Sequence, residues 1–300
     1  MDTLTHALLG LSISSFREHP KIQRPTIILA AVLGSELPDL DLLPGLFNPQ
    51  AQLVYHRGFS HSLLGLAVTA GLLTLALGEL DPRVSRTRLL TWTGLALLLH
   101  VLFDSLTTYG TWALYPFVTR PLALDILYSF DLPILVILGT GCFFYLARAR
   151  KNALRTAFIL VLMYAAGRWG YHARVDHILS GQQFPVYSLV PGDPLGRLVL
   201  IVDRGDYYQV GSLNISGQIR KLVKVDKNLH HPLALAVNQQ PVIDSFLGTA
   251  RYPYVEVARE GELWRIKYSD LRLWPHESFK AVVYLDDENR VVKIKLGPRN

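Results

Sequence analysis

The chain has 300 residues, of which 50% are hydrophobic and 18% are charged, and its formal net charge at pH 7 is +6. The basic residues fall in short stretches between apolar runs, which is typical of loops beside membrane segments and argues against a nucleic-acid-binding surface. The single cysteine, Cys142, excludes an internal disulfide.

Apolar segments dominate residues 1–180, whereas residues 185–300 have the composition of a water-soluble domain. The segments fall at roughly residues 3–16, 26–36, 62–78, 89–103, 132–147 and 155–171. Crossing a hydrocarbon core of ~30 Å takes about 20 residues, so we expect the last four to span and the first two to be half-buried or re-entrant helices. The predicted fold class is a mainly α, polytopic helical bundle with about four to six membrane segments, followed by a C-terminal α+β, mostly antiparallel β, soluble domain.

Basic residues cluster in alternate connections between these segments, and the positive-inside rule places such connections in the cytoplasm. They are Arg17, Lys21 and Arg24, then Arg83, Arg86 and Arg88, then Arg148, Arg150, Lys151 and Arg155. We therefore expect a multi-pass protein of the inner membrane, in contact with the lipid bilayer. The connections rich in His and Asp, and the C-terminal domain, should be extracytoplasmic.

The C-terminal part is predicted to be mostly β, and residues 254–258 and 263–268 alternate apolar and polar residues in the manner of strands. Strands are predicted at residues 197–202, 254–258, 263–268, 280–285 and 290–296. The last two flank an acidic turn at 286–289, which predicts a hairpin. Short helices are expected at 231–239 and 242–247. We interpret residues 185–300 as a β-rich accessory domain beside a membrane-embedded domain at residues 1–180.

Two histidines, His56 and His61, immediately precede the apolar segment at 62–78. A histidine beside hydrocarbon is costly without a partner, and a metal ion is a common partner. Arg57, between them, suits a phosphate or a carboxylate, because its guanidinium forms bidentate hydrogen bonds. Ser60 and Ser62 are interpreted as helix-capping residues rather than nucleophiles.

Carboxylates and histidines recur at the ends of other segments. Asp39 and Asp41 flank one residue in a Pro-led turn, where two carboxylates repel unless a cation bridges them or one is protonated. His100 and Asp104 are four residues apart, so both can meet one ion from one helix face; the alternative is a histidine paired with a carboxylate in the core. His6, in the first segment, is either a further ligand or a structural histidine.

Asp125 and Asp131 precede the segment at 132–147, and acids beside a membrane helix are costly and often functional. We expect one of them to act as a ligand or base. Nitrogen and carboxylate donors without thiolate suit Zn²⁺, with Mn²⁺ or Fe²⁺ as alternatives, and more than four candidates favour more than one ion or one ion with outer-sphere acids. The predicted ligands are His6, Asp39, Asp41, His56, His61, His100 and Asp104.

Several ordered stretches resemble a known family, the membrane-bound metal-dependent hydrolases, also described as LexA-binding, inner membrane-associated hydrolases. The resemblance covers roughly residues 1–170. That family is distantly similar to the zinc-dependent phospholipase C enzymes, whose ligands include a His-x-x-x-Asp pair, here His100 and Asp104. The matching stretches are MDTLTHALLG at residues 1–10, LPDLD at 37–41, HRGFSHS at 56–62, HVLFD at 100–104 and TTYGT at 107–111.

The resemblance implies a membrane-bound metal-dependent hydrolase, with a phosphoester or ester in a lipid or lipid-linked substrate as the first expectation. Arg57 would then stabilise developing phosphoryl charge, and Asp125 or Asp131 would orient or deprotonate water. The rival interpretation is a metal-binding scaffold or metal-ion transporter without hydrolysis. It ranks lower because an ion path needs polar residues at several depths, and segments 62–78 and 132–147 carry almost none. In a third interpretation, the β-rich domain carries the function by binding a partner or a wall component, and the membrane part anchors it. Substrate, number of ions and oligomeric state stay open.

Overall fold

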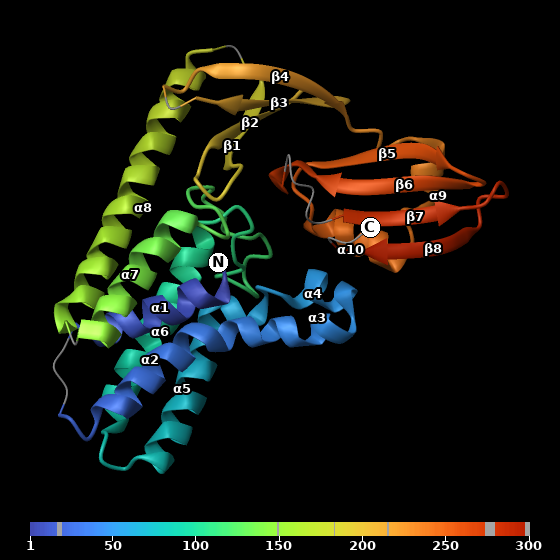
Figure 1. The fold of residues 1–300 in the computed structure, drawn as a ribbon. Coiled ribbons are helices and arrows are strands. Elements are labelled where there is room, and N and C mark those ends of the chain that lie inside the picture. Colours follow the sequence, from blue (N-terminus) through green and yellow to red (C-terminus); the bar gives the residue numbers. More distant parts are fainter. Residues whose placement is uncertain (17–19, 149, 183, 215, 274–279, 298–300) are drawn as a thin grey trace. The chain divides into compact units, whose positions relative to one another are not determined.

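The fold was obtained as a computed structural model that describes residues 1–16, 20–148, 150–182, 184–214, 216–273 and 280–297 (Figure 1). The chain divides into two compact units. A helical unit comprises residues 1–42, 55–172 and 193–196. A β-rich unit comprises residues 43–54, 173–192 and 197–300.

The helical unit is built from helices at each position where the sequence predicts an apolar segment. They are α1 (Thr3–Ser14), α2 (Arg24–Glu36), α5 (Leu63–Leu80), α6 (Arg86–Ser105), α7 (Leu132–Arg148) and α8 (Lys151–Ser180), whose last residues belong to the β-rich unit. Two 3₁₀ turns, η1 (Leu37–Leu42) and η2 (Phe59–His61), connect them. Helix α8 is longer than predicted, because no proline interrupts it before Gly181 follows its last residue.

Glycines let three of these helices approach closely. A Cβ atom on Gly10 of α1 would collide with Ser35 and Ala31 of α2, and one on Gly34 of α2 would lie 2.9 Å from the carbonyl oxygen of Thr93 on α6. Small residues at helix crossings permit such backbone contact. The crossing brings α1, the C-terminal end of α2 and α6 together, and these elements carry much of the predicted site.

The expectation of about four to six membrane segments is wrong. Among the described residues, one helix, α5 at Leu63–Leu80, is both long and apolar enough to cross a membrane. Helices α1 and α7 are apolar but only 12 and 17 residues long. Helices α6 and α8 have 20 and 30 residues, but their polar and charged side chains lower their hydropathy. The predicted sidedness of the loops depended on several alternating spans, and one candidate span does not support it.

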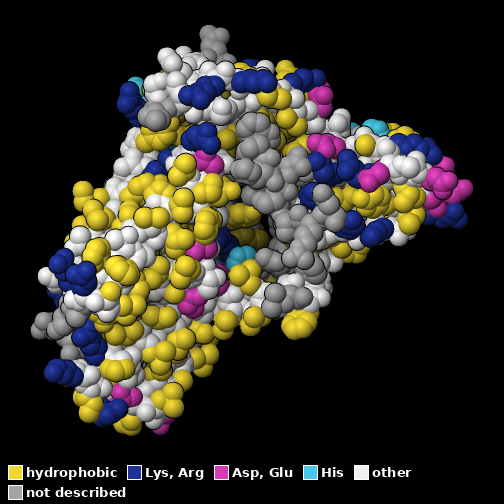
Figure 2. All heavy atoms as spheres, in the orientation of Figure 1, with side chains coloured by type: hydrophobic (Ala, Val, Ile, Leu, Met, Phe, Trp, Pro, Cys, Tyr) yellow, Lys and Arg dark blue, Asp and Glu magenta, His cyan; other side chains and the backbone are white. Residues whose placement is uncertain are grey.

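Apolar side chains nevertheless cover much of the outer face of the helical unit (Figure 2). On α5 the exposed ones recur at helical spacing, at Leu64, Val68, Leu72 and Leu75. Further exposed apolar side chains lie on α6, α7 and α8. Exposed apolar patches of this kind mark surfaces that contact a membrane or a partner.

The β-rich unit contains two four-stranded sheets, both antiparallel with neighbouring strands consecutive in the chain. The first holds β1 (Val186–Pro191), β2 (Leu198–Asp203), β3 (Tyr207–Leu213) and β4 (Ile219–Asp226). The second holds β5 (Pro253–Glu260), β6 (Leu263–Asp270), β7 (Lys280–Leu285) and β8 (Val291–Leu296). The antiparallel β part of the predicted fold class is therefore present, including the β7–β8 hairpin, in which Asp286 N–H donates to the Arg290 carbonyl at 3.1 Å.

Short helices complete the β-rich unit. They are α3 (Leu43–Phe47), α4 (Pro49–Tyr55), α9 (Pro232–Val237), α10 (Pro241–Thr249) and η3 (Leu271–Leu273). Val237 and Phe246, from α9 and α10, pack on Val255, Ile266 and Tyr268 in one buried cluster. The sequence did not predict β1, β3 or β4, because Pro191, Gly211 and the charges of β4 weaken their strand pattern.

Candidate metal centre

The centre forms where elements distant in the sequence meet inside the helical unit. Helix α6 contributes His100 and Asp104, which share one helix face. Helix α2 continues into η1, which carries Asp39, and η2 carries His61 just before α5 begins. All four side chains are buried, with exposed fractions of 0–8%. Burial of two carboxylates and two imidazoles in one place demands compensating partners.

Four donor atoms, one from each of these residues, lie within 4.8 Å of one another. The Nε2 atoms of His61 and His100 are 3.0 Å apart. Oδ1 of Asp39 lies 3.4 Å from His61 Nε2 and 3.7 Å from His100 Nε2. Oδ2 of Asp104 lies 3.6 Å and 3.8 Å from the same two nitrogens. Nitrogen and oxygen ligands of a tetrahedral zinc ion stand about 3.3 Å apart, because each bond is about 2.0 Å long.

The hydrogen bonds of the two imidazoles leave lone pairs facing this space. His100 Nδ1 lies 2.7 Å from the carbonyl oxygen of Ser35, so Nδ1 carries the proton and donates it. His61 Nδ1 lies 2.9 Å from Ser60 Oγ, and that hydroxyl donates to Asp41 Oδ2 at 2.5 Å, so His61 Nδ1 is also the donor. Both Nε2 atoms are therefore unprotonated acceptors.

The two carboxylate oxygens that face the imidazoles are buried and have no hydrogen-bond partner among the described residues. Nε of Arg57 forms an ion pair with Asp104 Oδ2 at 3.2 Å. Four acceptor atoms thus converge on one small space, and apart from the ion pair between Arg57 Nε and Asp104 Oδ2 they face one another without a hydrogen-bond donor among the described residues. The donor set, with imidazole and carboxylate and no thiolate, fits a divalent metal ion of the zinc, manganese or iron type.

Arg57 positions Asp104. Its Nη2 donates to Asp104 Oδ1 at 3.2 Å, and its Nη1 donates to Thr107 Oγ1 at 3.2 Å and to the Gly110 carbonyl at 3.3 Å. The Arg57 backbone has a φ of 63°, in the left-handed region, and its N–H donates to Asp41 Oδ2 at 2.9 Å. The buried guanidinium of Arg57 is thereby directed onto Asp104, a candidate metal ligand, rather than into solvent.

His6 lies beside the four donor atoms rather than among them. Its ring stacks on His100 with centroids 3.8 Å apart, and its Nε2 is 3.2 Å from Asp104 Oδ1. The same oxygen also contacts the backbone nitrogen of Met1. In this position His6 orients two of the donor residues from outside.

A second group of three donors adjoins the first and shares Asp39. It consists of Asp39, Asp41 and His56, whose donor atoms also lie within 4.8 Å of one another. His56 Nδ1 is 2.7 Å from Asp41 Oδ1. Asp41 and His56 are only partly buried, with side-chain exposures of 13% and 20%. This group forms the less enclosed side of the centre.

The protonation states suit metal binding. Burial alone would raise the pKa of Asp39, but a hydrogen bond from His61 and the charge of His100, which these imidazoles supply when protonated, bring that pKa down to about 2. Burial would also raise the pKa of Asp41, but hydrogen bonds from His56 and His61 hold that pKa well below its usual range. Burial lowers the pKa of His56, although its hydrogen bond to Asp41 opposes the change. At neutral pH these carboxylates are ionised and His56 is neutral, as ligands must be.

The two predicted catalytic acids lie elsewhere among the described residues. Asp131 is fully buried at the start of α7, where it accepts hydrogen bonds from Tyr164 Oη at 3.3 Å and from the Ile134 N–H at 3.4 Å. Asp125 is 8% exposed and has a φ of 55°. Neither belongs to the two donor groups, and a catalytic role for either stays a prediction.

Sequence reasoning missed the groups that orient the ligands. Ser62 caps α5 as predicted, by accepting the Gly65 N–H at 3.0 Å. The capping interpretation of Ser60 is wrong, because its hydroxyl links Asp41 to His61. The carbonyl of Ser35 was not singled out as a site group, whereas Thr107 belongs to the TTYGT stretch at residues 107–111 that carries the family resemblance. The position of Ser60 next to His61 could have indicated its contact with that imidazole. The contact of His100 with the Ser35 carbonyl could not be predicted, because every residue has a backbone carbonyl.

An α-helical unit with an apolar surface and a buried Asp/His centre is typical of a membrane protein able to hold a metal ion. A family model described as "YdjM inner membrane protein" matches residues 1–174, and the chain belongs to this family. All the residues of both donor groups lie within the matched range.

Two curated proteins are similar to parts of the chain. "Uncharacterized protein YfhP" of Bacillus subtilis (strain 168) is 30% identical over 137 residues, which is 44% of this chain and 42% of that protein. "Inner membrane protein YbcI" of Escherichia coli (strain K12) is 34% identical over 112 residues, which is 36% of this chain and 61% of that protein. The chain thus covers less than two thirds of either relative. No solved structure matches.

Proposed function

We propose that the chain is a membrane-bound metal-dependent hydrolase that holds Zn²⁺, with Mn²⁺ or Fe²⁺ as alternatives. The observation that carries this proposal is the convergence of four acceptor atoms, of which Asp39 Oδ1 and Asp104 Oδ2 are buried without hydrogen-bond partners. Leaving such atoms unpaired costs about 1–3 kcal/mol each, and more for charged groups, so a structure keeps them only where a ligand repays that cost.

Asp39, His61, His100 and Asp104 would hold the ion, which when bound would polarise the substrate oxygen and lower the pKa of a bound water toward about 7. Ser60 and the Ser35 carbonyl fix the two imidazoles so that Nε2 faces inward.

Arg57 anchors Asp104 through Oδ1 and adds a positive charge beside the centre, where anionic charge would develop on a phosphoester. The adjoining group of Asp39, Asp41 and His56 offers donors for a second ion or a proton acceptor at the less enclosed side.

A lipid or lipid-linked phosphoester or ester is the proposed substrate class. Two findings support it: the family is one of inner membrane proteins, and the helical unit exposes apolar side chains along α5 and its neighbours. A substrate already in the bilayer would reach such a protein without leaving the lipid phase. Asp125 or Asp131 remains the proposed base in this scheme.

A second candidate function, a metal-binding scaffold or metal-ion transporter without hydrolysis, is favoured by one specific observation. The first donor group offers four protein ligands, all at most 8% exposed. Structural zinc sites are closed by four protein ligands, whereas catalytic sites keep one position for water. The number of water ligands on the bound ion therefore separates the two functions.

The test uses the full chain purified in mild detergent. Its metal content is measured by elemental analysis, and the coordination of the bound ion by X-ray absorption spectroscopy. Turnover is then screened on phosphomonoester, phosphodiester and carboxylester lipids, with and without chelator, for the wild type, Asp104→Asn and the control His177→Ala. His177 is exposed on α8 and belongs to neither donor group.

The hydrolase proposal expects bound metal with at least one water ligand and turnover that chelator and Asp104→Asn abolish while His177→Ala retains it. Bound metal with four protein ligands and no water would instead establish the scaffold. Turnover that survives both chelator and Asp104→Asn would refute metal-assisted hydrolysis at this centre.

A further inference from the structure

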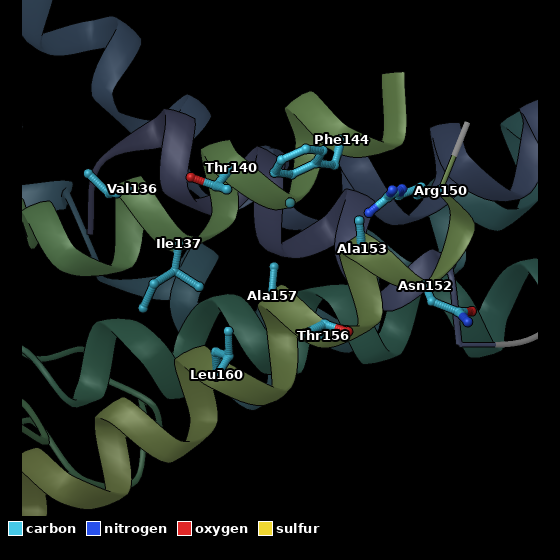
Figure 3. Close-up of a pocket in the computed structure, with 11 residues that line it drawn as sticks. Val136, Ile137, Thr140, Phe144, Arg150, Asn152, Ala153, Thr156, Ala157 and Leu160 are labelled. Atoms are coloured by element: carbon cyan, nitrogen blue, oxygen red, sulfur yellow. The ribbon is translucent and has the colours of Figure 1, made fainter. Parts of the chain in front are cut away.

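A groove of about 840 Å³ runs between α7 and α8, and it shares no residue with the metal centre (Figure 3). Its volume lies within the range of about 300–1,000 Å³ that is usual for small-molecule sites. The groove has two chemically different ends. Val136, Ile137 and Leu160 line one end, and Arg150 and Asn152 line the other.

Close helix packing forms the floor of the groove. A Cβ atom on Gly141 of α7 would collide with the side chain of Ala157 on α8, and would lie 3.1 Å from the carbonyl oxygen of Ala153. These small residues bring the two backbones together at this point. The larger side chains Phe144 and Leu160 then stand as walls on either side of a shallow apolar channel.

The charge around this channel has one sign. Residues 132–175 contain no Asp or Glu, whereas Arg148, Arg150 and Arg155 stand at or beside the junction of α7 and α8. The guanidinium of Arg150 lies 5.9 Å from the centre of the Phe144 ring, at the mouth of the groove. A guanidinium in this setting favours an anionic headgroup, because it can donate two parallel hydrogen bonds to a phosphate.

We propose that this groove binds one anionic phospholipid, with its phosphate at Arg150 and Asn152 and an acyl chain along Val136, Ile137 and Leu160. The positive charge of Arg150 favours an anionic headgroup, and the apolar end of the groove favours an acyl chain. From Val136 to Phe144 the helix rises about 12 Å, which is long enough to cover a substantial part of an acyl chain. A protein of an inner membrane family is surrounded by phospholipid, so such a ligand is present where the protein resides.

The experiment uses the full chain in mild detergent and two diazirine-bearing lipids with identical acyl chains, phosphatidylglycerol and phosphatidylcholine. After photolysis, labelled peptides are identified by mass spectrometry, and affinity is measured by competition with unlabelled lipid. Phosphatidylglycerol should label peptides within residues 136–160, and phosphatidylcholine should label them more weakly.

Two pairs of variants locate the site. Arg150→Gln removes the charge and should weaken phosphatidylglycerol binding about fivefold, while Arg120→Gln, at an exposed arginine outside the groove, should not. Thr140→Trp fills the groove from an exposed position and should abolish labelling by both lipids. Its control is Phe143→Trp, on the same helix but outside the lining, which should leave labelling intact.

Equal labelling by the two lipids, or no change in Arg150→Gln, would overturn the headgroup assignment. Labelling that persists in Thr140→Trp would overturn the groove as the site. A purified protein that is a dimer with the groove protected from label would show that a second copy, rather than a lipid, covers it. Asp104→Asn should leave lipid labelling unchanged, so failure of the metal centre cannot imitate failure of this site.

Discussion

Two buried carboxylates in this chain, Asp104 in the helical unit and Asp270 in the β-rich unit, have opposite hydrogen-bonding situations. Asp270 is 3% exposed and accepts backbone N–H groups from Arg251 at 2.9 Å, Tyr252 at 3.3 Å and Arg272 at 2.9 Å. Its Oδ2 also accepts from Nε of Arg272 at 2.7 Å. Asp104 is fully buried, yet its Oδ2 has no hydrogen-bond partner among the described residues.

Burial alone therefore does not identify a functional acid. A carboxylate whose oxygens are all paired with neighbouring N–H groups stabilises the fold by itself. The Oδ2 of Asp104 accepts no hydrogen bond among the described residues and faces two imidazole acceptors and a second such carboxylate oxygen, which favours a bound cation in addition to its ion pair with Arg57 Nε at 3.2 Å. The comparison therefore assigns Asp270 to the architecture of its unit and Asp104 to the metal centre.

The largest expected effect is loss of metal from His100→Ala. The change removes one of four donors, and the remaining imidazole loses its facing partner, so the metal content of the purified protein should fall sharply. The control His177→Ala should retain full content. Elemental analysis provides the measurement, and full metal content in His100→Ala would show that the centre as described does not bind the ion.

The next effect is on stability. Asp270→Ala breaks a buried ion pair and leaves three backbone N–H groups without an acceptor, so the free energy of unfolding should fall by about 3–5 kcal/mol. Metal content should not change. Asp287→Ala is the matched control, because its ion pair with Arg259 at 3.0 Å is exposed and such pairs contribute about 0–1 kcal/mol.

Urea unfolding followed by circular dichroism measures both variants, and Asp270→Asn serves if Asp270→Ala does not fold. A drop in metal content with unchanged stability would reverse the assignments of the two acids.

A smaller effect separates two neighbouring serines. Ser60→Ala removes the hydroxyl that orients His61, so metal affinity should fall about 10–100-fold, as it does when other groups that hydrogen-bond to a metal-ligating side chain are removed. Ser62→Ala removes the α5 cap and should cost about 1 kcal/mol of stability without weakening metal binding. Competition with a zinc chelator and thermal unfolding measure the two quantities. Equal metal affinity in both variants would remove Ser60 from the centre.

The smallest effect is expected for Arg57→Lys. Lysine keeps the charge but loses the planar fork that contacts Asp104, Thr107 and Gly110 together. Metal should be retained with affinity reduced by no more than about tenfold, while any turnover found should be slower. Thr107→Val, which removes one of the same hydrogen bonds without touching the charge, is the matched comparison. Unaltered turnover in Arg57→Lys would argue against Arg57 as a group that stabilises developing charge.

Much of the secondary structure was predictable from the sequence because its signals are local. Helical apolar runs located α1, α2 and α5 to α8. A continuous apolar run located β2, alternation located β5 and β6, and the acidic turn at 286–289 located β7 and β8 on either side of it. The number of membrane spans could not be predicted in this way, because segment 132–147 is apolar but short and segment 89–103 lies in a helix that carries polar groups. Counting segments by their apolar centres overestimated the spans.

Local sequence patterns specify most of the elements and the residue types at their ends, since hydrophobic period, turn residues and the spacing of His100 and Asp104 are properties of a few neighbouring positions. Which of the seven candidate ligands converge depends instead on how the helices pack. The close crossing at Gly10 and Gly34 sets that convergence. Nδ1 contacts to Ser35 and Ser60 then decide which imidazole nitrogen faces inward. Such contacts join residues far apart in the chain, and their geometry depends on how whole helices pack, which no local pattern encodes.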